Sequence, residues 1–377
     1  MIKVPASNLV PGMVLARAII EPEYKRVLLT AGQVLNEYYI KRIQEKGIPA
    51  VYVKDVLGIE KTVGPVAEEV IIESNKVLRE TFKSCMNTGR LTLKAIKSQV
   101  DLIIDELLRN QNLAIGLEDI RDYDSYTYQH SVSVCILSLI IGIKNGYNRE
   151  KLRNLGIGAI LHDIGKITVP QKILNKPGVL DDFEKEFIKK HPWEGFNIIR
   201  NSQEVSLVSA HVALQHHEHI SGKGYPQGLR GDKIHEFAQI AAVADIFDAL
   251  VSDRPYRLGY SNQEALEILY KESSGHIKKE YVDLLSQHII PYPPGTLVKL
   301  TTGDTAVVLG ENPDNLSKPR VKILLDMNNK PYQLIKEIDL SLFDNIQIKH
   351  ALNNAQAAEI LSQYTLKDEM IIRNFGS

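Results

Sequence analysis

The chain of 377 residues is long enough for two or three compact units, because single domains usually span about 100–200 residues. Its 45 Lys and Arg residues nearly balance its 46 Asp and Glu residues, which excludes attraction of nucleic acid or anionic membranes by overall charge. Two cysteines are too few for a disulfide framework, and the first residues lack a signal-peptide pattern. The most apolar stretch, residues 132–143, is shorter than the roughly 20 residues that cross a bilayer. We therefore expect a cytoplasmic protein without membrane insertion and without a nucleic-acid polymer as partner.

The first 60 residues predict a small α/β unit with a regulatory or docking role. Asn36 is a suitable N-cap for a helix at residues 37–46, which Gly47 would end. Runs rich in β-branched residues predict short strands at residues 13–20, 26–29 and 50–53.

The middle of the chain is predicted to be helical. In residues 61–115, apolar side chains recur at helical spacing, and they are Ile96, Val100, Ile103, Ile104, Leu107 and Leu108. These helices form a predicted connector that is either a homodimer interface or packed on the protein's own core. Helical character then continues to about residue 288, with breaks at 176–178 and 221–231, and predicts a domain at 116–290.

The C-terminal segment, residues 291–377, is expected to be β-rich. The sequence Pro-Tyr-Pro-Pro-Gly at 291–295 stops the helices. Short apolar runs separated by turn residues predict a small barrel or meander, with strands at 297–300, 306–309, 320–325 and 332–335. The tail is expected to be partly helical, chiefly at 351–362. The predicted fold class is therefore mainly α, with an all-helical core between a small N-terminal α/β unit and a small C-terminal β-rich unit.

Histidine and aspartate residues gather in the helical region. Of the eleven histidines, all but His350 lie between His130 and His288. Taken alone, each such residue could be a hydrogen-bonded structural histidine or a helix cap. Together they predict a metal cluster, because imidazole and carboxylate groups recur in five separate elements: His130, His162-Asp163, His191, His216-His217 and Asp245.

The pairing of neighbouring ligand types favours two metal ions over one. Adjacent residues on a helix point about 100° apart, so His162 and Asp163 are poorly placed to hold one ion, and His216 and His217 are expected to diverge likewise. An aspartate has two oxygens, however, and can bridge two ions. Asp245 lies in the apolar segment 240–247, where a buried carboxylate needs a compensating cation.

These motifs resemble the HD-GYP family, a branch of the HD-domain metal-dependent phosphohydrolases. Both family signatures are present, as His162-Asp163-Ile-Gly-Lys166 and as Gly224-Tyr225-Pro226 after His216-His217-Glu218. The flanking matches are His191-Pro192 with Gly195, Leu229 with Gly231, Val243-Ala-Asp245-Ile-Phe-Asp248-Ala, and Ser252-Asp253-Arg254-Pro255-Tyr256-Arg257. The resemblance covers residues 123–288, and the first 60 residues are similar to a small domain that often precedes HD-GYP domains.

The resemblance implies an all-helical core that hydrolyses bacterial cyclic dinucleotides, chiefly cyclic di-GMP. It assigns iron, or alternatively manganese, to a binuclear site in which Asp163 is the bridging ligand. The implied ligands are His130, His162, Asp163, His191, His216, His217 and Asp245. Some members carry a glutamate that supports a third ion at the position of Tyr126, so we expect two ions here. A second departure is Ser221, where the family usually has an aspartate.

Lys166 and Asp163 are the predicted catalytic residues. Two ions would share a bridging hydroxide, and the Lys166 ammonium would lie over the scissile phosphate and help to protonate the leaving oxygen. The predicted substrate contacts are Asp124, Tyr225, Arg254 and Arg257. Tyr225 could stack on a base and Asp124 could accept from guanine, with a helix N-cap as its alternative. The arginines suit phosphate oxygens and guanine edges, with a surface salt bridge as the alternative.

The leading hypothesis is a phosphodiesterase that converts cyclic di-GMP to pGpG and, with a second cut, to GMP. One alternative is hydrolysis of another cyclic dinucleotide, such as cyclic GMP-AMP. Another is a non-catalytic cyclic di-GMP receptor, which the complete ligand set disfavours. His211, His219 and His235 match no ligand position and are expected to be structural.

Overall fold

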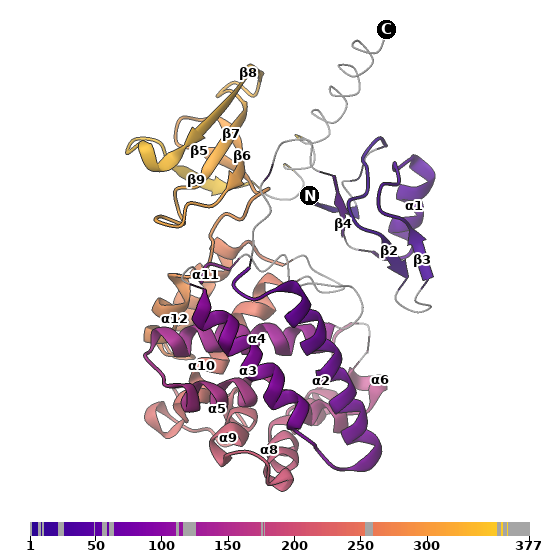
Figure 1. Ribbon diagram of the computed structural model, residues 1–377, viewed down its shortest axis with the longest axis vertical. Coiled ribbons are helices and arrows are strands. Elements are labelled where there is room, and N and C mark those ends of the chain that lie inside the picture. The colour runs from indigo at the N-terminus through magenta and orange to yellow at the C-terminus, as the bar shows by residue number, and fades with distance from the viewer. Residues whose placement is uncertain are drawn as a thin grey trace. The chain divides into compact units, whose positions relative to one another are not determined.

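Two apolar helices form the centre of the helical unit in the computed structural model. Helix α4 (Tyr126–Lys144) and helix α10 (Glu236–Val251) contact each other, and buried residues occur on all sides of the described part of each. A helix that is apolar all round must be covered on every side. Shorter helices complete the unit, and several of them surround this pair in Figure 1. They are α5 (Arg149–Ile160), α6 (Gln171–Leu174), α7 (Asp182–Ile188), α8 (His191–Ser202), α9 (Leu207–Gln215), α11 (Asn262–Glu272) and α12 (Lys279–Ser286), with the 3-10 turns η3 (Ile164–Thr168) and η4 (Gly231–Lys233).

Helices α2 (Glu68–Thr88) and α3 (Lys94–Arg109) belong to the same unit, which comprises Gly64–Ser252 and Gln263–Ile289. Ile96, Ile103 and Ile104 of α3 are fully buried in the hydrophobic core that includes α4. Two ion pairs tie α3 to α5, Arg153 with Asp101 at 2.8 Å and Arg149 with Asp105 at 2.6 Å. The predicted connector at 61–115 thus packs on the protein's own core, and a homodimer interface stays a prediction.

The N-terminal region contains two short antiparallel pairs and one helix. Strand β1 (Ile2–Pro5) pairs with β4 (Ala50–Val53), and β2 (Ile19–Glu21) pairs with β3 (Arg26–Leu29). Helix α1 (Glu37–Glu45) begins as predicted, since the Asn36 side chain accepts a hydrogen bond from the Tyr39 amide at 2.8 Å. The strand predicted at 13–20 is wrong over most of its length, because only its last two residues join β2.

The C-terminal region is a five-stranded antiparallel sheet in the order β8-β7-β6-β5-β9. Its strands are β5 (Leu297–Leu300), β6 (Thr305–Gly310), β7 (Arg320–Leu325), β8 (Pro331–Asp339) and β9 (Ile348–Ala351), with the 3-10 turn η5 (Leu340–Leu342). All six residues of the central strand β6 are buried. The mainly α fold class with a β-rich C-terminal unit is confirmed. The predicted helix at 351–362 is wrong at its start, because Ala351 ends β9, and most of it lies outside the described residues.

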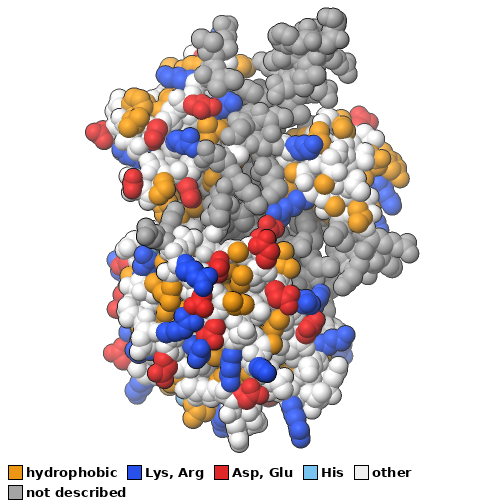
Figure 2. Space-filling model, in the orientation of Figure 1, with side chains coloured by type: hydrophobic (Ala, Val, Ile, Leu, Met, Phe, Trp, Pro, Cys, Tyr) orange, Lys and Arg blue, Asp and Glu red, His pale blue; other side chains and the backbone are white. Residues whose placement is uncertain are grey.

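The structure describes residues 2–6, 9, 11–21, 26–48, 50–54, 59, 64–110, 113–115, 126–174, 176, 178–252, 259–352, 356 and 360. The chain divides into two compact units, of which one contains the N- and C-terminal regions and the other contains the helices from α2 onward. The predicted domain boundaries stay a prediction. Among the described residues, no helix combines the length and the apolar content that crossing a bilayer requires. Lysine, arginine and acidic side chains are interspersed on the face shown in Figure 2, which matches the balanced net charge.

Candidate metal centre

Seven side chains from separate elements converge inside the helical unit. His130 lies on α4, His162 and Asp163 follow α5, and the rest come from α8, the end of α9 and α10. Their ligand atoms form three groups in which all atoms lie within 4.8 Å of one another. The groups are His130 with His162 and Asp245, His162 with Asp163 and His216, and His191 with His216 and His217. We call the first group the α4–α10 group and the last the α8–α9 group. The structure thus brings together all seven residues named as ligands from the sequence.

A pair of glycines lets η3 approach α8 closely enough to form the cluster. A Cβ atom on Gly165 would lie 1.9 Å from the His191 carbonyl oxygen and 2.6 Å from the Gly195 amide nitrogen. No larger residue fits at position 165 without moving one of these backbones. The glycine of the His162-Asp163-Ile-Gly-Lys166 signature therefore sets the distance between Asp163 and His191.

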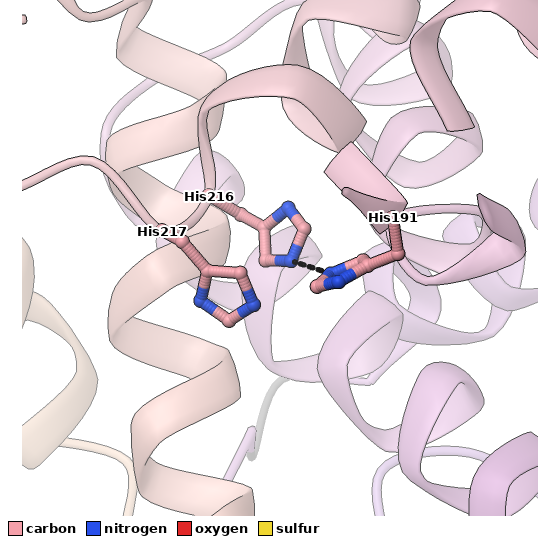
Figure 3. A group of neighbouring side chains, drawn as sticks. All are labelled: His191, His216 and His217. Carbon is pink, nitrogen blue, oxygen red and sulfur yellow. Dashed lines mark hydrogen bonds between the residues drawn. The ribbon is translucent and has the colours of Figure 1, made fainter. Parts of the chain in front are cut away.

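The adjacent ligand pairs do not diverge as expected. His162 Nε2 lies 3.4 Å from Asp163 Oδ2, and the rings of His216 and His217 have centroids 4.0 Å apart. The expectation assumed α-helical geometry, but α5 ends at Ile160 and α9 ends at Gln215. Figure 3 shows His216 and His217 on the same side, facing His191.

Asp163 lies between the two outer groups. Its Oδ1 is 3.3 Å from His191 Nε2 and 3.9 Å from His216 Nε2. Its Oδ2 faces His162 and accepts a hydrogen bond from Lys166 Nζ at 2.5 Å. Burial acts to raise the Asp163 pKa, but the charge of Lys166, with the contact to His162, outweighs it and lowers the pKa well below 3.8. The carboxylate is ionised and offers one oxygen to each side.

Three histidines are oriented by backbone carbonyl groups. The Nδ1 atoms of His162, His191 and His216 lie 2.8 Å, 2.6 Å and 3.0 Å from the carbonyl oxygens of Ala159, Ile188 and Ala213. A neutral imidazole carries one hydrogen, and a carbonyl oxygen can only accept it, so the hydrogen resides on Nδ1. Each Nε2 therefore presents a lone pair, as a metal ligand must.

These lone pairs face one another without a donor. His191 Nε2 and His216 Nε2 are 3.3 Å apart (Figure 3), and the buried Nε2 of His162 has no hydrogen-bond partner among the described residues. Buried nitrogen atoms in this arrangement need a cation. The donor set of imidazoles and carboxylates suits iron, manganese or zinc, so the residues present fit a metal site.

Burial keeps the α8–α9 group neutral. It lowers the pKa of His191 to about 4 and that of His217 to about 3. Burial, aided by His217, also lowers the pKa of His216 well below 6.5. All three are therefore uncharged near pH 7, which is the form that binds a metal ion.

The α4–α10 group differs because His130 lies between two carboxylates. Its Nε2 is 3.0 Å from Asp245 Oδ1, and its Nδ1 is 2.7 Å from Asp248 Oδ2. Burial acts to lower the His130 pKa, but the hydrogen bonds that His130 donates to these carboxylates outweigh it and raise the pKa well above 6.5. Asp245, expected to be buried, keeps 16% of its side chain exposed. Sequence reasoning assigned no role to Asp248, although its i,i+3 spacing from Asp245 placed both carboxylates on one helix face.

The Gly-Tyr-Pro loop closes over the α8–α9 group. The Tyr225 ring stacks on His217, with centroids 4.8 Å apart and planes at 25°. Glu218, a buried residue to which no role was assigned, accepts hydrogen bonds from the amides of Gln227 at 2.6 Å and Leu229 at 2.9 Å. Glu218 thereby supplies a carboxylate acceptor within a loop that has Ser221 in place of the family's aspartate.

Several predicted site residues cannot be placed. Asp124, Arg254 and Arg257 lie outside the described residues, as does the side chain of Tyr126. His211 and His235 stack on each other with centroids 6.3 Å apart and belong to none of the three groups.

Comparison with known proteins matches residues 117–280 to the HD domain and residues 297–360 to a KOW domain associated with the HD domain. A cyclic di-GMP phosphodiesterase of Pseudomonas aeruginosa is 37% identical over 239 residues, which cover 63% of this chain and 58% of the relative. A 3′3′-cGAMP-specific phosphodiesterase 2 of Vibrio cholerae is 30% identical over 238 residues, covering 62% and 44%. The chain thus spans about half the length of these relatives.

Among solved structures, the HDG"Y"P protein from Bdellovibrio bacteriovorus has a TM-score of 0.51 at 19% identity, over 75% of this chain and 97% of that one, and so shares the fold. The residues that match the HD domain thus include the whole histidine–aspartate cluster. Both signatures lie within the residues matched to the HD domain, so the comparisons support the resemblance to the HD-GYP family.

Proposed function

We propose that the protein is a metal-dependent phosphodiesterase that hydrolyses cyclic di-GMP to pGpG and, with a second cut, to GMP. The observation that carries this proposal is Asp163, whose two oxygens face two different groups of ligand atoms. Support also comes from relatives named as phosphodiesterases of cyclic dinucleotides.

Two metal ions, iron or alternatively manganese, are the proposed cofactors. The α4–α10 group would hold one and the α8–α9 group the other, with Asp163 contributing to both. Bound metal ions would supply a strong nucleophile from water at neutral pH and neutralise charge on the phosphate. The chain itself contributes neutral imidazoles, fixed in orientation by backbone carbonyl groups, and a carboxylate kept ionised by Lys166.

Lys166 is the proposed proton donor and phosphate contact. Its side chain is 27% exposed, and its Nζ reaches Asp163 Oδ2. An ammonium at this place can donate to a phosphate oxygen while it remains paired with Asp163, since it has three hydrogens to give. It would also deliver a proton to the leaving sugar oxygen, with Arg254, Arg257 and Asp124 as proposed contacts to the rest of the substrate.

Two other functions are open to direct test. A relative specific for 3′3′-cGAMP favours a mixed cyclic dinucleotide as the alternative substrate. In either case Tyr225 lies at the edge of the cluster, where its contact with His217 would place a nucleotide beside the scissile phosphate. A non-catalytic receptor is the other alternative, and the complete set of seven ligand residues argues against it.

The test is turnover of cyclic di-GMP and of cyclic GMP-AMP by purified protein, with metal content measured on the same sample. Formation of pGpG by a metal-loaded protein supports the proposal. Faster cleavage of cyclic GMP-AMP would instead assign cyclic GMP-AMP as the substrate. Asp163→Asn should lose activity, whereas Asp182→Asn, at a fully exposed position of α7, should keep it. Binding without cleavage by the metal-loaded protein would contradict the proposed activity.

A further inference from the structure

The Gly-Tyr-Pro loop is fastened at its base to the turn between α11 and α12. The amide of Ile220 donates to the His276 carbonyl oxygen at 3.0 Å, and the amide of Ser221 donates to the Gly275 carbonyl oxygen at 3.0 Å. Two consecutive loop amides thus donate hydrogen bonds to a turn that lies more than fifty residues further along the chain. These contacts fix the backbone of the loop at Ile220 and Ser221.

Side chains reinforce this attachment. The rings of His219 and His276 have centroids 3.6 Å apart with planes at 31°, and His276 Nδ1 lies 2.9 Å from Glu272 Oε2. Glu272 ends α11, and its carbonyl oxygen accepts from the His276 amide at 2.9 Å. The end of a rigid helix therefore holds the His276 ring, and the His276 ring covers His219.

A displacement of His219 would be passed on to Tyr225. A Cβ atom on Gly224 would lie 2.3 Å from the His219 amide nitrogen, so the backbones at these two positions touch. The next residue, Tyr225, donates its amide hydrogen to the His217 carbonyl oxygen at 3.1 Å and stacks its ring on His217. The contacts thus run without a break from Glu272 through His276 and His219 to Tyr225.

We infer that His276, held by Glu272, is a positioning residue that fixes Tyr225 over the cluster and so sets the affinity for the substrate. The inference rests on the proposed function for its kinetic consequence. Among the described residues, His276 belongs to none of the three ligand groups, so its loss should leave the cluster intact. If the loop is not already ordered, part of the binding free energy is spent on ordering it, and the affinity for the substrate is lower.

The variants are His276→Ala, which removes the ring, His276→Phe, which restores a ring, and Glu272→Gln, which removes the charge of its partner. Asp283→Asn is the matched control, because it breaks a Lys279–Asp283 ion pair of the same i,i+4 spacing on α12. We expect His276→Ala to raise the KM for cyclic di-GMP about 10-fold with kcat changed less than about 2-fold, the pattern of lost uniform binding. Hydrolysis of bis(p-nitrophenyl) phosphate, which needs only the metal centre, should keep its rate. His276→Phe should recover most of the loss, and Asp283→Asn should behave as wild type.

Hydrogen exchange of the metal-free protein gives a readout that is independent of activity. Peptides from residues 219–231 should exchange faster in His276→Ala and Glu272→Gln, while peptides from α10 stay protected. An equal fall in the rates on both substrates, unchanged exchange of 219–231, or the same effects in Asp283→Asn would overturn the inference. If wild-type protein cleaves neither substrate, the proposed function fails, and exchange alone decides whether His276 positions the loop.

Discussion

The two outer groups of the cluster differ in how one histidine, His130, is oriented. In the α8–α9 group, His191 and His216 bond to backbone carbonyl oxygens, which come with the fold and cannot be removed by substitution. In the α4–α10 group, His130 bonds to the Asp248 carboxylate, which a single change removes. The groups also differ in charge, since burial keeps the three imidazoles of the first neutral whereas His130 of the second shares a proton with carboxylates. The α8–α9 group thus uses backbone carbonyl groups, whereas the α4–α10 group uses a carboxylate for His130 and a backbone carbonyl group for His162.

The largest loss of activity is expected from substitution of Asp163, which lies between the two groups. Asp163→Asn removes the charge that faces both groups, and we expect activity to fall roughly 10³-fold or more, as for groups that act as a unit. Metal content and cyclic di-GMP turnover are the measurements. A variant that retains full metal content and activity would show that Asp163 does not join the two groups.

Lys166→Met should separate chemistry from metal binding. The substitution keeps the side-chain length but removes the ammonium that bonds to Asp163 Oδ2. We expect turnover to fall about 10²-fold, the scale for loss of one donor that stabilises developing charge, with metal content intact. Lys172→Met, on the nearby helix α6, is the matched control. Loss of metal in Lys166→Met would assign the residue to the cluster's assembly and not to the reaction.

Asp248→Asn should weaken metal binding by the α4–α10 group only, because Asp248 orients His130 of that group. Loss of a carboxylate behind a ligating histidine typically costs about 10–100-fold in metal affinity. Titration of the metal-free protein should then show one weakened site and one unchanged site. Ser252→Ala, which removes a 3.3 Å contact to the same carboxylate, should change the affinity far less. Equal weakening of both sites would contradict the division into two groups.

Acid should destabilise the metal-free protein through the α8–α9 group. The folded pKa values of His191 and His217, about 4 and about 3, lie below the ordinary 6.5, so the unfolded chain binds protons that the folded one does not. Their contribution is fully present above pH 6.5 and is lost as the pH falls towards 4, by up to about 1.4 kcal/mol per pH unit for each histidine. His130, with a raised pKa, acts in the opposite sense and loses its contribution as the pH rises. Chemical denaturation between pH 4 and 8 measures this; His191→Asn should reduce the acid slope, and an unchanged slope would contradict the assignment.

Local sequence signals located several elements of the fold. Asn36 indicated the start of α1, and the apolar runs at Leu297–Leu300 and Arg320–Leu325 became β5 and β7. Strand β9 and the turn at His162-Asp163 were not predicted. Each depends on a tertiary partner, since β9 is a four-residue strand completed by β5, and Gly165 holds its turn against α8.

The ligand residues were named from motifs, but their supporting contacts were not. Asp248 and Glu218 are both in the quoted motifs, yet which imidazole or amide each one meets depends on how α4 packs on α10 and how the loop folds back. His276 carries no motif signal at all, because its partner His219 is distant in sequence. Such contacts follow from packing, which spacing alone does not specify.

The most direct test of the central claim is the metal content per chain of the wild type, Asp248→Asn and His191→Asn, measured by mass spectrometry after loading with iron or manganese. Because the two groups share Asp163, we expect about two ions per chain in the wild type. At limiting metal, each variant should hold about one ion. The ion lost in Asp248→Asn and the ion lost in His191→Asn should differ in affinity, because each variant empties a different group. A single ion in the wild type, lost completely in both variants, would contradict the two-site account.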